Sequence, residues 1–224
     1  IDDLLNHRLT RAIKRTKPVT EELKDPDIIA NIEDIEQTTK AMFHYMELNA
    51  DDPERMNLYH SLLKRTYCAV ADLDLIWLYS FRKFYSELHK KGDPSPKSSD
   101  LITTILESFV SDLAMLSLEA DNDETRKKKA DIYERHQKSM SELFAAVAMS
   151  CQWSKDLSEF WTDMITSPTI DTSDALLLTS GITLGALTEF DINRTITLAD
   201  IYANASDTAL RQRALTGFVL SVDS

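Results

Sequence analysis

The stretch SDTALRQRALTGFVLSV, residues 206–222, is the most informative part of this chain. Asp207 stands where a helix would begin, and an aspartate there accepts hydrogen bonds from N–H groups of the first turn. Leu210, Ala214 and Gly217 then fall on one side of the helix. Glycine inside a helix costs about 1 kcal/mol relative to alanine, so its presence here predicts that a neighbouring helix approaches closely.

A similar pattern occurs earlier in the chain. Asp174 and Asp207 are 33 positions apart, and superposing them places Gly181 on Ala214. Gly181 and Gly185, in the sequence GITLG, have the spacing of small residues on a helix side that packs against another helix. The similar G-x-S-x-G nucleophile motif needs a preceding strand, whereas helical patterns flank this stretch. Two related helical hairpins are therefore predicted.

The last hairpin, residues 190–222, resembles a HEAT repeat. The family pattern has an aspartate in the turn, then an aliphatic residue, an arginine, an alanine and a small residue, and the matching positions are Asp207, Leu210, Arg211, Ala214 and Gly217. The resemblance covers residues 156–222 and implies an α–α superhelix, or solenoid, at the C-terminal end, with Asp207 and Arg211 pairing between units in structural roles. The 33-residue offset is short for HEAT units, so armadillo-type stacking is the alternative.

The whole chain is predicted to be all-α. It has only 4 Gly and 6 Pro in 224 residues, which is poor material for the many turns of a β-sandwich or barrel. Asp25 and Pro26 predict the start of a helix that runs to about Leu48. Asp52 and Pro53 are expected to begin the next helix in the same way, and the periodicity suggests roughly eight to ten helices.

The clearest break in the helical pattern is KGDPSPKSSD, residues 91–100, where glycine, two prolines and serines favour turns. It separates a predicted N-terminal helical region, residues 1–91, from a second region, residues 100–224, that ends in the HEAT-like hairpins. One continuous domain is the alternative. The sequence begins at Ile1 rather than Met, and we expect it to be a fragment of a longer chain whose upstream part could hold a signal.

Charge disfavours two classes of partner. A net charge of -12 opposes binding to nucleic acid and to anionic membranes, because both need clustered cations. Residues 1–99 hold 15 Lys and Arg against 17 Asp and Glu, whereas residues 100–224 hold 10 against 20, so a basic protein partner would meet the second half. Basic runs at residues 7–17 and 126–129 are interpreted as solvent-exposed helix faces, with binding of an anionic partner as the alternative.

No motif in the sequence indicates catalytic residues, a cofactor or a metal site. The five histidines are scattered and lack HExxH or ExxH spacing. Cys68 and Cys151 have apolar and aromatic neighbours and are interpreted as buried thiols without a disulfide. No apolar run approaches the length of a membrane span and no signal peptide is visible. We expect no cofactor, no nucleic acid and no membrane span, and among compartments the cytoplasm is favoured.

Aromatic side chains crowd the run LIWLYSFRKFYSEL, residues 75–88. On a helix, Trp77, Phe81, Phe84 and Tyr85 point in several directions, so a core can cover only some of them. These four residues are predicted to contact a partner. The predicted function is a non-enzymatic protein-interaction or scaffolding module. A helical enzyme or ligand-binding domain, with a site formed by residues distant in sequence, remains the alternative, as does self-association through the aromatic helix.

Overall fold

The computed structural model describes residues 2–49, 52–92 and 98–223. These residues form eleven helices and no strand, so the all-α prediction is confirmed and the expected number of helices was slightly low. The chain divides into two compact units, Ile1–Lys83 and Phe84–Ser224. Each unit is described by itself.

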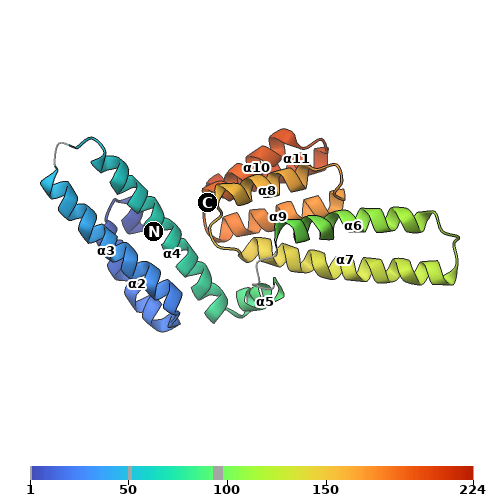
Figure 1. Ribbon diagram of the computed structural model, residues 1–224, viewed down its shortest axis with the longest axis horizontal. Coiled ribbons are helices and arrows are strands. Elements are labelled where there is room, and N and C mark those ends of the chain that lie inside the picture. Colours follow the sequence, from blue (N-terminus) through green and yellow to red (C-terminus); the bar gives the residue numbers. More distant parts are fainter. Residues whose placement is uncertain (1, 50–51, 93–97, 224) are drawn as a thin grey trace. The chain divides into compact units, whose positions relative to one another are not determined.

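The first unit is a bundle of three long helices preceded by a short one. Its helices are α1 (Asp2–Leu5), α2 (Leu9–Leu23), α3 (Pro26–Leu48) and α4 (Arg55–Phe81). The three long helices pack against one another, and α1 packs on α2 (Figure 1). Their buried apolar side chains include Leu9, Ile13, Ile32, Ile35 and Leu62. The unit therefore has a hydrophobic core of its own.

The predicted start of α3 at Asp25 and Pro26 is confirmed. Asp25 Oδ1 accepts hydrogen bonds from the backbone N–H groups of Asp27 at 3.0 Å and Ile28 at 3.2 Å. The proline occupies the first turn, where a helix needs no N–H donor. The helix ends at Leu48, as expected.

The parallel prediction for Asp52 and Pro53 was wrong in position. The helix begins only at Arg55, and no side chain caps it. Asp52 Oδ1 instead accepts the backbone N–H of Glu54 at 2.8 Å, and its other oxygen accepts the hydroxyl of Tyr45. The carboxylate thus stabilises the turn before α4 rather than the helix itself.

The division between the units falls at Lys83 and Phe84, shortly before the break predicted at residues 91–100. Helix α4 ends at Phe81, and Arg82 takes an extended backbone conformation, φ -109° and ψ 115°. That single residue divides a stretch in which the sequence pattern allows either one long helix or two.

Gly92 explains why α5 (Lys83–Lys91) goes with the second unit. Gly92 is buried, and a Cβ at this position would lie 2.7 Å from the backbone nitrogen of Ala146 in α7 (Asp123–Met149). A residue with a side chain could not bring the end of α5 so close to α7. Residues 93–97, at the centre of the predicted break, lie outside the described residues.

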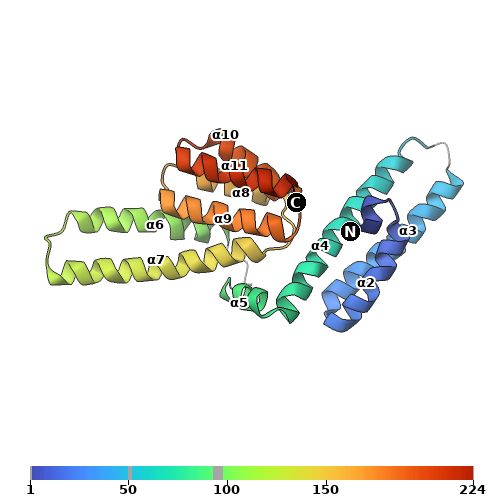
Figure 2. The ribbon, with the colours of Figure 1, turned by 180° about the vertical axis from the view of Figure 1, so that it is seen from behind.

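The second unit combines α5 and a long helical hairpin with four further helices. The helices that follow α5 are α6 (Ser99–Ser117), α7, α8 (Lys155–Thr166), α9 (Thr172–Thr188), α10 (Ile192–Asn204) and α11 (Thr208–Asp223). The far end of the α6–α7 hairpin extends beyond the other helices of the unit (Figures 1 and 2). Helix α9 packs on α7, α10 packs on α8, and α11 packs on both α9 and α10.

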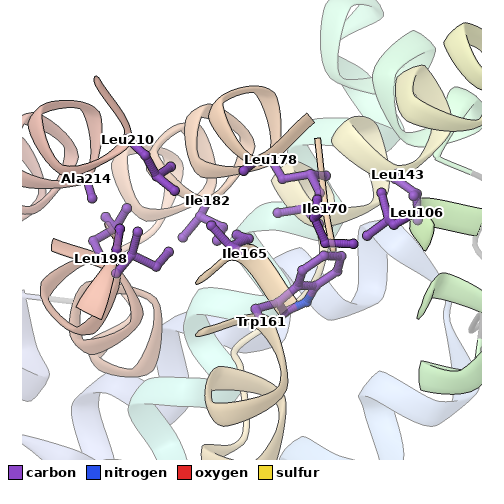
Figure 3. Close-up of a cluster of buried hydrophobic side chains, with 14 of the residues drawn as sticks. Leu106, Leu143, Trp161, Ile165, Ile170, Leu178, Ile182, Leu198, Leu210 and Ala214 are labelled. Atoms are coloured by element: carbon purple, nitrogen blue, oxygen red, sulfur yellow. The ribbon is translucent and has the colours of Figure 1, made fainter. Parts of the chain in front are cut away.

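A continuous apolar core runs through these helices. Leu178, Ile182 and Leu198 are fully enclosed, at 0% exposure. Further members shown in Figure 3 are Leu106, Leu143, Trp161, Ile165, Ile170, Leu210 and Ala214. Truncating an enclosed leucine to alanine typically costs roughly 2–5 kcal/mol, so this core fixes how α7 to α11 are packed.

Helix α11 packs as its small residues predict. Asp207 Oδ1 accepts the backbone N–H of Leu210 at 2.8 Å. Ala214 is 0% exposed, and Gly217 is buried. A Cβ at Gly217 would collide first with the Thr183 hydroxyl of α9 and would lie 3.2 Å from the side chain of Leu198 in α10, so both helices approach α11 closely here.

Candidate functional site

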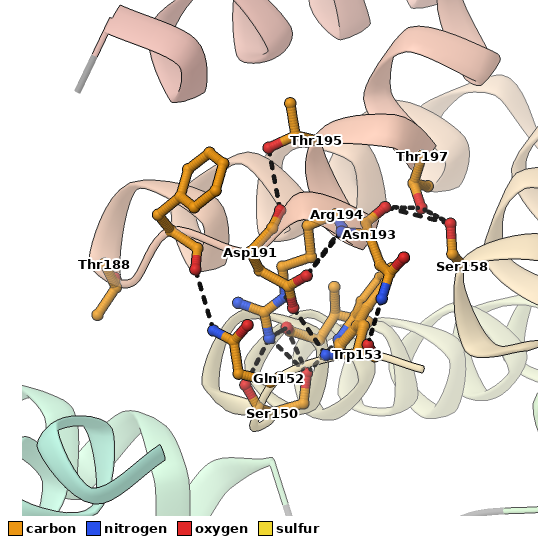
Figure 4. A network of polar contacts seen from close by, with 12 residues as sticks. Ser150, Gln152, Trp153, Ser158, Thr188, Asp191, Asn193, Arg194, Thr195 and Thr197 are labelled. Carbon is orange, nitrogen blue, oxygen red and sulfur yellow. Dashed lines mark hydrogen bonds and ion pairs between the residues drawn. The ribbon is translucent and has the colours of Figure 1, made fainter. Parts of the chain in front are cut away.

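A buried network of polar side chains joins the end of α7 to the start of α10 (Figure 4). Arg194 and Asp191 are at its centre, with side chains only 3% and 1% exposed, and Arg194 Nε lies 3.7 Å from Asp191 Oδ2. A charge pair this deeply buried is stable only when further hydrogen bonds satisfy both partners. The surrounding groups supply such bonds to Nη2 of Arg194 and to both carboxylate oxygens of Asp191.

The guanidinium of Arg194 caps the end of α7. Its Nη2 donates to the carbonyl oxygens of Ser150 and Val147, the second at 3.3 Å, and to Ser150 Oγ at 2.7 Å. Helix α7 ends at Met149, so these carbonyls belong to a helix terminus that lacks intrahelical donors. The guanidinium carbon also lies 5.2 Å from the centre of the Trp153 ring, within the range of a cation–π contact.

The carboxylate of Asp191 holds the start of α10 and the loop before α8 together. Its Oδ1 accepts the N–H groups of Asn193 at 2.8 Å and Arg194 at 3.3 Å, and its Oδ2 accepts the N–H of Trp153 at 2.7 Å. Asn193 Nδ2 donates to the Trp153 carbonyl at 2.6 Å, and Ser158 and Thr197 share a hydrogen bond of 2.7 Å. The network is an internal brace between α7, α8 and α10.

Gly185 provides the space for this brace. A Cβ at Gly185 would lie 2.7 Å from the guanidinium carbon of Arg194 and 3.1 Å from the carbonyl oxygen of Ala148. Gly181, one turn earlier, faces Phe144 of α7, with 3.2 Å between its hypothetical Cβ and the ring. The glycines of GITLG therefore lie where α9 packs on α7 and α10.

A second buried pair, His136 and Asp174, lies where α6, α7 and α9 meet. His136 Nε2 is 2.7 Å from Asp174 Oδ2, and both side chains are 10% exposed. The Phe109 ring stacks on the imidazole, with 3.5 Å between ring centres and 7° between planes. Burial raises the pKa of Asp174, while the hydrogen bond and charge of His136 act in the opposite direction.

A hollow of about 220 Å³ lies beside His136, between α6 and α7. Its polar lining consists of Ser108, Asp112, Arg135, Ser139 and the imidazole itself. Ligand pockets usually measure about 300–1,000 Å³, so only a small molecule fits. Nothing in the sequence predicted this site, because His136 and Asp174 belong to no shared motif and meet only through packing.

Superposing Asp174 on Asp207 relates two residues with different roles. Asp207 caps α11, whereas α9 is capped by Asp171, whose Oδ1 accepts the N–H of Ser173 at 2.8 Å. Asp174 lies inside the first turn of α9 and pairs with His136. The 33-residue offset therefore does not superpose two aspartates that both cap a helix.

Arg211 also differs from what the HEAT resemblance implies. Its guanidinium carbon lies 5.2 Å from the centre of the Tyr202 ring, and the ion pairs of the described residues do not include one with Asp207. The link from α11 to α9 is made by Arg213, whose Nη1 donates to Ser180 Oγ at 2.7 Å.

The four aromatic residues predicted as an interaction surface form two pairs, one in each unit. Trp77 and Phe81 lie on α4 with 5.6 Å between ring centres, and Phe84 and Tyr85 lie on α5 with 5.4 Å. Phe81 and Phe84 are 49% and 64% exposed, while Trp77 and Tyr85 are half-buried. Each pair thus presents one exposed ring, and contact with a partner stays a prediction.

The two cysteines differ in exposure. Cys68 is half-buried on α4, whereas Cys151 is exposed. The expectation that both are buried was wrong for Cys151, because α7 ends two residues before it and its backbone belongs to the following loop.

Apolar side chains also follow the outer sides of α10 and α11. Ile192 and Ile196 of α10 are 45% and 44% exposed, and Leu215, Val219 and Val222 of α11 are 39%, 54% and 61% exposed. Members of each set are three or four residues apart, so each set forms a stripe along its helix, opposite the buried side. We call these five side chains the outer apolar residues.

Comparison with known proteins assigns no family to this chain. It matches no protein-family model, no curated protein and no solved structure. Within the described residues, every helix is too short or too polar to cross a lipid bilayer.

Proposed function

We propose that this chain is a protein-interaction module whose second unit binds a protein partner through the outer apolar residues. One observation carries the proposal: the five outer apolar residues are 39% to 61% exposed, although α10 and α11 also bury apolar side chains against α8, α9 and each other. Helices of this kind are normally covered on both sides, and contiguous exposed apolar surface often marks a binding site.

The brace beneath α10 supports this role. Asp191 and Arg194 join α10 to α7 and to the loop before α8 through bonds to the backbone, so the outer residue Ile192 projects from a helix that is held at its base. A surface that is already ordered loses little conformational entropy on binding. Within this proposal, α8–α9 and α10–α11 act as two HEAT-like hairpins of a solenoid, and the partner packs against the last one.

The partner that suits this surface combines an apolar helix with basic flanks. The outer apolar residues would receive the helix, and residues 100–224, with 20 acidic against 10 basic side chains, would attract positive charge. The exposed rings of Phe81 and Phe84 are proposed as further contacts.

The test is affinity capture with the whole chain as bait, comparing the wild type with a Leu215→Glu, Val219→Glu variant. Gln212→Glu is the matched control, because Gln212 is exposed on the same helix and the change also adds negative charge. We expect a protein that is retained by the wild type and the control and lost from the double variant. Equal retention by all three proteins would contradict the proposal, and light scattering would reveal whether the partner is a second copy of the chain.

A second candidate function, binding or conversion of a small molecule, is favoured only by the hollow beside His136. There the imidazole is held by Asp174 at 2.7 Å, and a histidine oriented by a carboxylate can exchange protons with a bound group. Soaking the protein with a library of fragments and following the His136 ring resonances by NMR would test this candidate.

A further inference from the structure

Three arginines of the first unit converge on one buried aspartate. Arg15 Nη1 lies 2.8 Å from Asp3 Oδ2, while Arg11 Nε and Arg8 Nη1 lie 3.5 Å and 3.9 Å from Asp3 Oδ1. The Asp3 side chain is 7% exposed, whereas those of the three arginines are 55% to 64% exposed. The guanidinium groups therefore lie on the solvent side of the carboxylate.

The charges at this cluster do not balance. Only Arg15 comes within 2.8 Å of Asp3, the separation of a tight ion pair. Arg8 and Arg11 keep most of their donor groups for other acceptors. Asp74 of α4 lines a hollow of about 370 Å³ together with Asp3 and Arg15, and the cluster stays positive even when this second carboxylate is counted.

The local backbone adds to the positive potential. Arg8 precedes the first turn of α2, where no side chain caps the helix and no acidic residue occurs. The corresponding position of α3 is occupied by Asp25, which caps that helix. Cations are unfavourable at a helix N-terminus, so Arg8 and Arg11 are placed where an anion would relieve their repulsion.

We propose that Arg8 and Arg11 bind the phosphate group of a small molecule, with Asp3 and Arg15 holding the cluster together. The planar fork of an arginine matches two oxygens of a phosphate, and the exposed forks of Arg8 and Arg11 lie on the solvent side of Asp3. This assignment replaces the interpretation of residues 7–17 as a purely solvated face. It uses residues of the first unit and is independent of the function proposed for α10 and α11.

The test is a titration of the whole chain with inorganic phosphate, followed by the backbone amide NMR signals of residues 8–11. We expect saturable shifts with phosphate and much weaker ones with acetate at equal ionic strength. Arg8→Gln combined with Arg11→Gln should weaken phosphate binding about tenfold or more, since each charged hydrogen bond contributes measurably to affinity. Arg65→Gln, which removes an exposed arginine paired with Asp34, should leave binding unchanged.

Three results would overturn the assignment. Equal shifts with acetate and phosphate would show general screening, and undiminished binding by the double variant would place the phosphate elsewhere. Retention on vesicles with anionic headgroups, without binding of free phosphate, would indicate a membrane surface instead of a small molecule. If the double variant unfolds, the single variant Arg8→Gln is the test. Arg8 lies 3.9 Å from Asp3 and contributes least to the fold. Phosphate affinity of this variant must then still fall severalfold.

Discussion

Arginine and aspartate meet in two places in this chain, with opposite arrangements. In the brace beneath α10, one arginine faces one aspartate, both at most 3% exposed, and the arginine donates to the backbone of α7. At the start of the first unit, one buried aspartate faces three arginines that are each more than half exposed.

The burial of the arginines and the ratio of arginines to aspartates together explain what each site can do. A buried guanidinium must use its donors inside the protein, because water cannot replace them, and Arg194 accordingly serves the backbone of α7. An exposed guanidinium keeps its hydration and can exchange water for a ligand at little cost. The brace is therefore structural, whereas the arginine cluster has charge and donors available for binding.

Replacing Arg194 should have the largest effect. Arg194→Ala leaves Asp191 buried without its cation and removes the cap from the end of α7, and breaking a buried pair from one side costs about 3–5 kcal/mol. Urea unfolding followed by the fluorescence of Trp153 and Trp161, both in the second unit, measures the loss. Arg213→Ala, at an exposed arginine on α11, should cost far less. A loss below about 1 kcal/mol for Arg194→Ala would show that the brace is dispensable.

Filling the space beside the Arg194 guanidinium should have the next largest effect. Gly185→Ala places a methyl group against Arg194 and the Ala148 carbonyl, and overpacking of this kind costs about 1–3 kcal/mol. In an Arg194→Ala background much of that clash disappears, so the two changes should be non-additive. A double-mutant cycle of unfolding free energies tests this, and strict additivity would separate the glycine from the brace.

Some of these contacts follow from the sequence and others do not. The caps at Asp25 and Asp207 and the packing of Ala214 and Gly217 could be predicted, because they depend on residues within one or two helical turns. The partners of Arg194 and His136 could not, since they come from other helices and only tertiary packing selects them. The capping role of Asp191 was detectable, as an aspartate directly before a helical pattern.

Single residues also account for features of the fold that the sequence pattern did not locate. Arg82 interrupts a helix without any proline or glycine to announce the break, and Gly92 ties α5 to the second unit through a contact with distant Ala146. Asp171 rather than Asp174 caps α9, although both aspartates lie near the start of the same helical pattern. Likewise, the basic run at residues 7–17 did not indicate that its arginines surround the buried carboxylate of Asp3.

The His136–Asp174 pair provides an intermediate case, a buried carboxylate beside an imidazole. Burial raises the pKa of Asp174, so the folded chain holds a proton at pH values where the unfolded chain has lost it. The corresponding stability is present at low pH and is lost as pH rises from about 3.8, the ordinary value, through the raised pKa. Asp174→Asn removes this dependence. The unfolding free energy of the variant should therefore rise relative to that of the wild type as pH increases over this range.

Urea titrations at a series of pH values measure that change. At neutral pH we expect a difference of only about 0.5–1.5 kcal/mol, because asparagine can still accept a hydrogen bond from His136. Asp163→Asn, at an exposed position of α8, is the control and should leave the pH profile unaltered. A wild-type advantage that grows with pH would mean that the ion pair with His136 outweighs burial.

The smallest effect is expected at the arginine cluster, and it separates the two sites most sharply. Arg11→Gln removes a contact of 3.5 Å made by a side chain that is 57% exposed, and exposed ion pairs contribute only about 0–1 kcal/mol. Asp3 keeps Arg15 at 2.8 Å, so its buried charge remains compensated. The unfolding free energy of the first unit should barely change while phosphate affinity falls. Unfolding followed by Trp77 fluorescence in a variant that replaces Trp153 and Trp161 with phenylalanine isolates this unit. A loss comparable to that of Arg194→Ala would make Arg11 a structural residue and remove the distinction between the two sites.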